Sequence, residues 1–376
     1  MAPSLLIPAA LSSSRHAVSP ASRMHGRFAP TLRPARRTAA AAAAGDVQMG
    51  VLDDILARKQ KEVAALKESM PDDAAELLGK TTKHKNTFLK AIKKPKGTIS
   101  VVGQMKVKQP NIGQFSDIPA PDFLSAHMYE AGAAACSMCC DKETYGFDYS
   151  DVAAVYKQQL RYKGNFPGPL PILAHDFFID ECQLAVAAAQ GAKAVNLNVA
   201  LYKGDTEMLK GLLASTDKLG MDAVVEVHNK EELDMAVAAG AQIIGVCNRN
   251  MDTFELITES CSDTREWLKP FEETVFALVK DIPAGILPVA MGGVNETITA
   301  WTLRDEGYSS IIVGEAIVRG SEMRMSTGPY QSAYNEAKGL IMAFRSKGSR
   351  KYGPTGTGSF YGKGEGAKET LGMISI

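Results

Sequence analysis

Four ionisable residues lie at the ends of short aliphatic runs in this chain: Lys106, His175, Glu226 and Arg249. Lysine, histidine and glutamate side chains can move protons, and the planar guanidinium of an arginine suits a carboxylate or a phosphate. Aliphatic runs that break abruptly into polar residues or glycine are typical of parallel strands whose carboxyl ends carry a site. The pattern predicts acid–base chemistry on a small anionic molecule.

The role of each of these residues has an alternative at this level. Glu226 lies among valines in VVEVH, where burial would raise its pKa and suit it to proton transfer, unless it only pairs with a neighbouring Lys or Arg. Lys106 would present a compact positive charge, but Lys108 has the same strand parity. His175 suits acid–base work near neutral pH, and it equally suits a rim histidine bonded to its neighbours. The sequence leaves these choices open.

Glycines near the end of the chain indicate a phosphate site. Gly292 and Gly293 follow the seventh aliphatic run, and Gly314 follows the eighth, with Glu315 next to it. In many barrels the backbone N–H groups of these two loops and a short helix N-terminus hold a phosphate. We therefore expect an anion-holding edge at this place.

The elements that must position these residues alternate between strand and helix patterns. A closed parallel (β/α)8 TIM barrel accounts for eight such units, and a doubly wound open sheet is the alternative. Apolar residues at helical spacing and early aspartates predict a leading helix over 51–70, which would act as a lid or as an oligomer contact. The eight expected strands are 98–105, 133–140, 170–177, 193–201, 222–228, 242–249, 286–293 and 310–318.

Composition limits the classes of partner. Net charge is zero, but residues 1–45 hold six arginines and no acid, which leaves 36 basic against 42 acidic residues in the remainder. This mildly acidic body argues against nucleic-acid binding. No apolar run reaches the roughly 18 residues of a membrane helix. Cys136, Cys139 and Cys140 lack a second ligand cluster at zinc-site spacing, so we expect buried thiols and no metal.

The two ends of the chain differ from its middle. Residues 1–45 are rich in Ala, Ser, Pro and Arg and have no compact apolar core, which favours a plastid transit peptide over a secretory signal or a merely disordered leader. Residues 346–376 are rich in Gly, Lys and Ser and predict a flexible tail, with a partner-binding strip as the alternative. The barrel is expected over 46–345, in the plastid stroma.

The strings HDFFID, VVEVHNKEELDMAVAAGAQIIGVCNR and VGEAIVR, with the leading helix VLDDILARKQKEVAALK, resemble indole-3-glycerol-phosphate synthase over roughly 50–345. That family closes the indole ring of a carboxyphenylamino-deoxyribulose phosphate with loss of CO₂ and water, in tryptophan synthesis. The resemblance implies a carbon–carbon lyase (carboxy-lyase) with a phosphorylated substrate, no metal and no organic cofactor.

The family's pattern is carried over residue by residue. Lys106 matches the lysine of a Glu-x-Lys pair on the first strand, Glu226 matches the strand-five glutamate, and Arg249 matches the strand-six arginine. The resemblance implies catalytic roles for Lys106, His175 and Glu226. It implies substrate binding by Phe177, Cys247, Arg249, Gly292, Gly293, Gly314 and Glu315.

Several family residues are replaced in this chain. Gln104 stands where the family has the glutamate of Glu-x-Lys, and His175 stands where it has a lysine, with Asp176 and Phe177 kept. Cys247 replaces an asparagine. The family's Ser-Pro-Ser reads Gln109, Pro110 and Asn111, its Glu-Ser-Gly reads Met291, Gly292 and Gly293, and polar Asn196 and Asn198 interrupt the fourth strand.

These replacements leave three hypotheses. The chain is a weakened synthase with His175 as acid, Lys106 assisting and Glu226 as base; or a non-catalytic descendant, a phosphate-binding or scaffold protein of the plastid with a protein partner on its tail; or a lyase or isomerase acting on another sugar phosphate. Loss of single catalytic groups commonly costs about 10²–10⁴-fold in rate, so the replacements weigh against full synthase activity.

Overall fold

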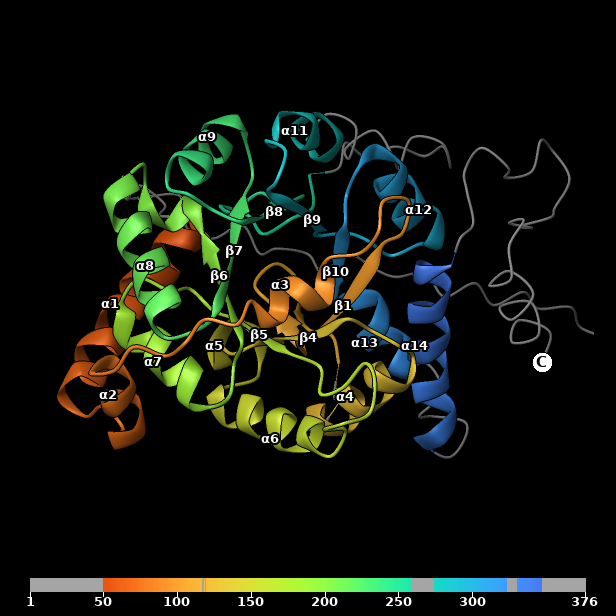
Figure 1. Ribbon diagram of the computed structural model, residues 1–376, viewed down its shortest axis with the longest axis horizontal. Coiled ribbons are helices and arrows are strands. Elements are labelled where there is room, and N and C mark those ends of the chain that lie inside the picture. The colour runs from red at the N-terminus through yellow and green to blue at the C-terminus, as the bar shows by residue number, and fades with distance from the viewer. Residues whose placement is uncertain (1–49, 117, 119, 258–273, 323–329, 347–376) are drawn as a thin grey trace, which may run out of the picture. The chain divides into compact units, whose positions relative to one another are not determined.

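Eight parallel strands close into a barrel in the computed structural model, which describes residues 50–116, 118, 120–257, 274–322 and 330–346 (Figure 1). Around the barrel the strand order is β1-β10-β9-β8-β7-β6-β5-β4. The first strand pairs with the last, because Ser100 aligns with Ser310, and β1 also pairs with β4. The prediction of a (β/α)8 barrel is confirmed, and the open sheet is excluded.

The strands are short and buried, as parallel strands covered on both faces must be. The barrel strands are β1 Ser100–Met105, β4 Ala135–Cys139, β5 Ile172–His175, β6 Ala194–Asn198, β7 Asp222–Val227, β8 Ile243–Cys247, β9 Leu287–Met291 and β10 Ser310–Val313. A small antiparallel hairpin, β2 Lys108–Gln109 with β3 Gly113–Gln114, follows β1.

Helices surround the strands (Figure 1). Before β1 stand α1 Val51–Glu68, α2 Asp72–Leu78 and α3 Thr87–Ile92. The later helices are α4 Pro121–Glu130, α5 Lys142–Tyr145, α6 Tyr149–Leu160, α7 Glu181–Ala189, the 3₁₀ turn η1 Val199–Tyr202, α8 Thr206–Lys218, α9 Lys230–Ala238, α11 Val275–Asp281, α12 Thr297–Glu306, α13 Glu315–Glu322 and α14 Tyr330–Arg345.

Strand alternation decides which side chains enter the barrel. Val102, Leu173 and Val224 form part of an inner apolar cluster together with Phe88 and Ile92 of α3. The helix α3 lies at the amino ends of the strands, where the Asp222 carboxylate accepts hydrogen bonds from the backbone N–H groups of Phe88 and Leu89 at 2.9 and 3.2 Å. Apolar side chains fill this end of the barrel, so only the carboxyl end is left for a site.

Seven of the eight expected strands end earlier than predicted, by one to five residues. The run 310–318 differs most: it stops at Val313, because α13 begins at Glu315. The run 193–201 stops at Asn198, because the Asn198 side chain accepts the backbone N–H of Ala200 at 3.0 Å and starts η1. The run 286–293 stops at Met291, since Gly292 and Gly293 have φ of 83° and 78°, which no strand residue adopts. Asn198 therefore lies at the barrel mouth.

The remaining predictions concern the leading helix, membrane-spanning helices and the two ends of the chain. The leading helix is confirmed as α1. None of the described helices combines the length and apolarity needed to cross a membrane. The leader 1–45 and residues 347–376 of the tail lie outside the described residues.

Candidate functional site

A polar cavity lies at the carboxyl ends of the barrel strands. It collects residues from β1, β5, β6, β7, β8, β9 and β10 and from the loops that follow the strands. Of the residues expected to form the site, its lining includes Lys106, His175, Glu226, Cys247, Arg249, Gly292, Gly293, Gly314 and Glu315. The structure thus brings together residues that are up to 209 positions apart, because parallel strands present their carboxyl ends at one rim.

Lys106 is the buried cation of this cavity. Its ammonium nitrogen makes no hydrogen bond or ion pair with any described residue and lies 5.8 Å from the ring centre of Tyr145, within cation–π range. Burial, reinforced by the positive charge of Arg249, lowers the pKa of Lys106. Lys108 belongs to β2 and lies outside the cavity lining. The choice between the two lysines is therefore settled by the hairpin that begins after Val107.

Glu226 is held by two side chains. The Asn196 amide donates to Oε2 at 2.5 Å, and His228 Nε2 lies 3.3 Å from Oε1. Burial alone would raise the pKa of Glu226, but His228, the nearby His175 and the Asn196 amide together lower it to about 2. The expectation of a raised pKa is wrong, because it counted burial and missed these partners. An ionised Glu226 is a hydrogen-bond acceptor and only a weak base.

His175 ends β5 with its imidazole buried in the cavity wall. Its Nδ1 is buried and forms no hydrogen bond with the described residues, and the ring meets Tyr145 edge-on at 5.8 Å between centroids. Burial lowers the pKa of His175; the negative charge of Glu226 opposes this lowering and the positive charge of Lys106 adds to it. The neutral imidazole therefore prevails near pH 7, which suits hydrogen bonding better than proton donation.

Arg249 and Cys247 line the β8 side of the cavity. Arg249 donates from Nη1 to the carbonyl oxygen of Phe254 at 2.8 Å, which holds the guanidinium at the rim. Cys247 is buried, and burial raises the pKa of its thiol. A fixed guanidinium near a buried ammonium makes this side of the cavity suitable for an anion.

The glycine edge lies next to the β8 side, at the ends of β9 and β10 and the start of α13. A Cβ added at Gly292 would come within 3.1 Å of the Asn248 backbone nitrogen, and one at Gly314 within 2.9 Å of Gln104 Oε1. Gly292 therefore has no room for a side chain and also has a positive φ, whereas a Cβ at Gly314 would require the Gln104 side chain to move. Glu315 is paired with Arg319 at 2.8 Å, so its charge is partly neutralised.

Phe177 is the expected site residue that the cavity lining does not include. It is buried behind the wall, stacked on Tyr145 at 5.7 Å and against Phe254 at 6.3 Å between ring centroids. Tyr145, Phe254, Met251 and Asn295 are lining residues that sequence reasoning missed, and Asn198 was noted only as a polar interruption of the fourth strand. Most of these lie in loops after the strands, where periodicity gives no signal.

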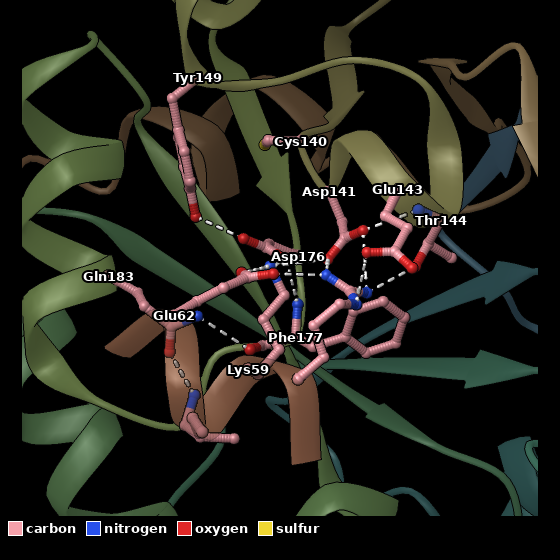
Figure 2. A network of polar contacts seen from close by, with 12 residues as sticks. Lys59, Glu62, Cys140, Asp141, Glu143, Thr144, Tyr149, Asp176, Phe177 and Gln183 are labelled. Atoms are coloured by element: carbon pink, nitrogen blue, oxygen red, sulfur yellow. Dashed lines mark hydrogen bonds and ion pairs between the residues drawn. The ribbon is translucent and has the colours of Figure 1, made fainter. Parts of the chain in front are cut away.

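A buried ion network fastens α1 beside this rim (Figure 2). The Lys59 ammonium contacts Asp141 at 2.7 Å and Asp176 at 2.8 Å, and Arg58 pairs with Asp141 at 2.8 Å. Asp176 also accepts the Tyr149 hydroxyl at 2.7 Å, so it serves this network and does not line the cavity. Burial alone would raise the pKa of Asp141, but the cations Lys59 and Arg58 lower it to about 2.

The fold and this rim define a class, a (β/α)8 barrel with a polar cavity at the carboxyl ends of its strands. Residues 52–328 match the family described as indole-3-glycerol phosphate synthase. Because this match spans well over half of the chain, the chain belongs to the indole-3-glycerol phosphate synthase family.

Curated relatives support this assignment over nearly their full length. An indole-3-glycerol phosphate synthase of Chlorobium chlorochromatii is 31% identical over 73% of this chain and 98% of its own length. One of Desulfotalea psychrophila is 30% identical over 72% and 94%, and one of Chlorobium phaeovibrioides is 27% identical over 75% and 99%.

Proposed function

We propose that the cavity binds the phosphorylated carboxyphenylamino substrate of the family and closes the indole ring slowly, with Lys106 as the proton donor. The observation that carries this proposal is the placement of Lys106, which is buried, unpaired among the described residues and in one cavity with Arg249 and the glycine edge. A lysine that acts as a general acid must hold its proton near the reacting atom and have a pKa lowered toward the working pH. Burial lowers the pKa of Lys106 in this direction.

The other residues take roles that follow from their contacts. Arg249 would clamp the substrate carboxylate, and the backbone N–H groups near Gly292, Gly293 and Gly314 would hold the phosphate. Glu226 would accept a hydrogen bond from a substrate hydroxyl, and neutral His175 would orient the substrate. Ring closure loses CO₂ and water, and this arrangement supplies a cation and a carboxylate for both steps.

The rate should be low because two carboxylates of the family are missing from the cavity. Gln104 and Met291 line it in their places, and neither can take a proton. A lost acid–base partner costs on the order of 10²–10⁴-fold, so slow turnover is the expected result.

The test is conversion of the carboxyphenylamino-deoxyribulose phosphate to a fluorescent indole product by the full chain. Lys106→Met should abolish the signal, whereas Lys108→Met, outside the cavity, should keep it. His175→Asn should cost less than Lys106→Met. If the Lys106 variant retains wild-type rate, or the wild type gives no product at high enzyme concentration, the proposal is wrong.

A non-catalytic phosphate-binding barrel is the second candidate, and the same uncharged Gln104 and Met291 favour it. In that case the wild type gives no indole, but inorganic phosphate still raises its melting temperature. A ligand at 100 times its Kd adds roughly 2.7 kcal/mol, which a thermal-shift assay detects. A lyase or isomerase on another sugar phosphate would appear in the same assay as a larger shift with that sugar phosphate.

We also propose that residues 1–45 direct the chain to the plastid stroma and that the tail 346–376 binds a protein partner there. Six arginines, no acid and abundant Ala and Ser support the first part, and a Gly- and Lys-rich composition supports the second. Import of a fluorescent protein carrying residues 1–45 into isolated chloroplasts tests the address. Affinity capture from stroma with the full chain and with a chain ending at Ser346 tests the tail, and equal recoveries would contradict it.

A further inference from the structure

Three metal-binding side chains meet beside the cavity at the ends of β7 and β8. Glu226 and His228 are two positions apart, so their side chains point to the same face of the strand. Glu226 aligns with Gly245 and Val227 with Val246, and this register continued by one residue sets His228 beside Cys247. One ligand atom of each of Glu226, His228 and Cys247 lies within 4.8 Å of the others.

The imidazole of His228 is oriented toward the other two. Its Nδ1 lies 2.8 Å from Glu232 Oε2, which also accepts the His228 backbone N–H at 2.8 Å. Asn229 donates to the other oxygen of Glu232 at 3.0 Å. This leaves Nε2 buried, without a hydrogen bond to any described residue, in a side chain 8% exposed. A carboxylate on one ring nitrogen, with the other nitrogen turned toward further ligand atoms, is how proteins orient metal-binding histidines.

We propose that Glu226, His228 and Cys247 bind a divalent transition-metal ion of the Zn²⁺ class. Zn²⁺ accepts sulfur, nitrogen and oxygen ligands at about 2.0–2.3 Å, so neighbouring ligand atoms of a tetrahedral site are about 3.3–3.8 Å apart. The distance of 3.3 Å between His228 Nε2 and Glu226 Oε1 already fits one edge. Ca²⁺ and Mg²⁺ take oxygen ligands, and the thiol and imidazole argue against them.

The site leaves room for a further ligand on the cavity side, because Glu226 and Cys247 also line the cavity. On binding, the ion takes an electron pair from the thiolate, the imidazole nitrogen and the carboxylate. The protons that Cys247 Sγ and His228 Nε2 carry in the metal-free protein pass to solvent. The expectation of no metal site rested on the Cys136, Cys139 and Cys140 group, whereas this cluster uses a different cysteine and depends on strand register.

Cobalt provides a direct readout that does not depend on turnover. The full chain, stripped with a chelator and kept reduced by a phosphine, is titrated with Co²⁺. We expect a near-ultraviolet thiolate-to-cobalt charge-transfer band that saturates at one equivalent, and Zn²⁺ should displace it. Cys247→Ser should remove the band, and Cys182→Ser, on α7 outside the barrel, should leave it unchanged.

Two further variants keep the test decisive if Cys247→Ser folds poorly. His228→Gln should weaken Zn²⁺ binding about 100-fold or more by calorimetry, and Glu232→Gln, which only orients the histidine, about 10-fold. Absence of the band in the wild type, or its persistence in a folded Cys247→Ser protein, would overturn the proposal. Neither measurement uses the substrate, so failure of the proposed synthase activity would be seen separately.

Discussion

Three side chains set how protons can move in the cavity. Lys106 is buried with its pKa lowered, Glu226 is ionised by its partners, and His175 has a lowered pKa that favours its neutral form. The cavity therefore holds one cation able to donate a proton and one anion that holds its charge firmly. The cavity's other carboxylate, Glu315, is paired with Arg319. At position 104, where the family has a carboxylate, this chain has the uncharged Gln104.

Restoring that carboxylate should increase the rate. The variant Gln104→Glu changes an amide to an acid of nearly the same volume, so it fits beside Gly314 without repacking. We expect kcat/KM for indole formation to rise about 10-fold or more, because a carboxylate can take a proton where an amide cannot. Steady-state fluorescence measures it. The exposed Gln60→Glu on α1 is the control, and an equal rate in both variants would contradict the role of position 104.

At the scale of elements, α1 is attached to the barrel by charge as well as by apolar packing. Lys59 lies between two carboxylates from different loops, after β4 and after β5. A buried ion cluster of this kind costs free energy to bury, but breaking it costs more, because removing one charge leaves its partners buried and uncompensated. The network explains how a helix outside the eightfold repeat keeps its position beside the rim.

Removing the central cation should therefore destabilise the protein. Lys59→Met keeps the length of the side chain but leaves Asp141 and Asp176 without it, and we expect the free energy of unfolding to fall by about 3 kcal/mol. Urea unfolding followed by circular dichroism measures this. Lys61→Met, exposed on the same helix, should stay within about 0.5 kcal/mol of the wild type. Similar losses in both variants would argue against the network.

The same network predicts how stability depends on pH. The pKa of Asp141 in the folded chain, about 2, lies below its ordinary value of 3.8. The contribution of the ionised Asp141 carboxylate to the free energy of unfolding is therefore complete above pH 3.8 and is lost as the pH falls toward 2. The difference between the two pKa values corresponds to about 2 kcal/mol of stability. Urea unfolding at pH 7, 5 and 3 should show the gap between wild type and Asp141→Asn narrowing only at the lowest pH; a constant gap would disagree.

At the scale of the whole molecule, the ring is closed by parts from the two ends of the barrel sequence. β1 pairs with β10, and α14 packs against α13, α4 and β1. Ile341 and Phe344 of α14 are fully buried, and Arg345 donates to the carbonyl oxygen of Ala131 at 2.7 Å. Closure thus depends on a helix that follows the last strand.

Truncating a buried α14 side chain should weaken the whole barrel. Phe344→Ala is expected to lower the free energy of unfolding by about 3–5 kcal/mol, because it removes a fully buried ring. Lys338→Ala, also on α14, breaks only a partly exposed ion pair with Glu130 of α4 and should cost less than about 1 kcal/mol. Thermal or urea unfolding distinguishes them. A Phe344 variant as stable as the Lys338 variant would mean that α14 is dispensable.

The sequence alone determined the barrel and the rim positions of Lys106, His175, Glu226 and Arg249. This was possible because buried parallel strands are continuous aliphatic runs, and their polar ends must share one edge. It did not determine which lysine enters the cavity, because Lys106 and Lys108 share a parity and only the hairpin after Val107 separates them.

Only the tertiary structure decided the charge state of Glu226, the attachment of α1 and the meeting of His228 with Cys247. Each depends on atoms from separate strands or loops that register and packing bring within a few ångströms, such as the Asn196 amide 2.5 Å from Glu226. Strand periodicity reports the face on which a side chain lies. It does not report the neighbour across the next strand, and that neighbour sets both pKa and ligand geometry.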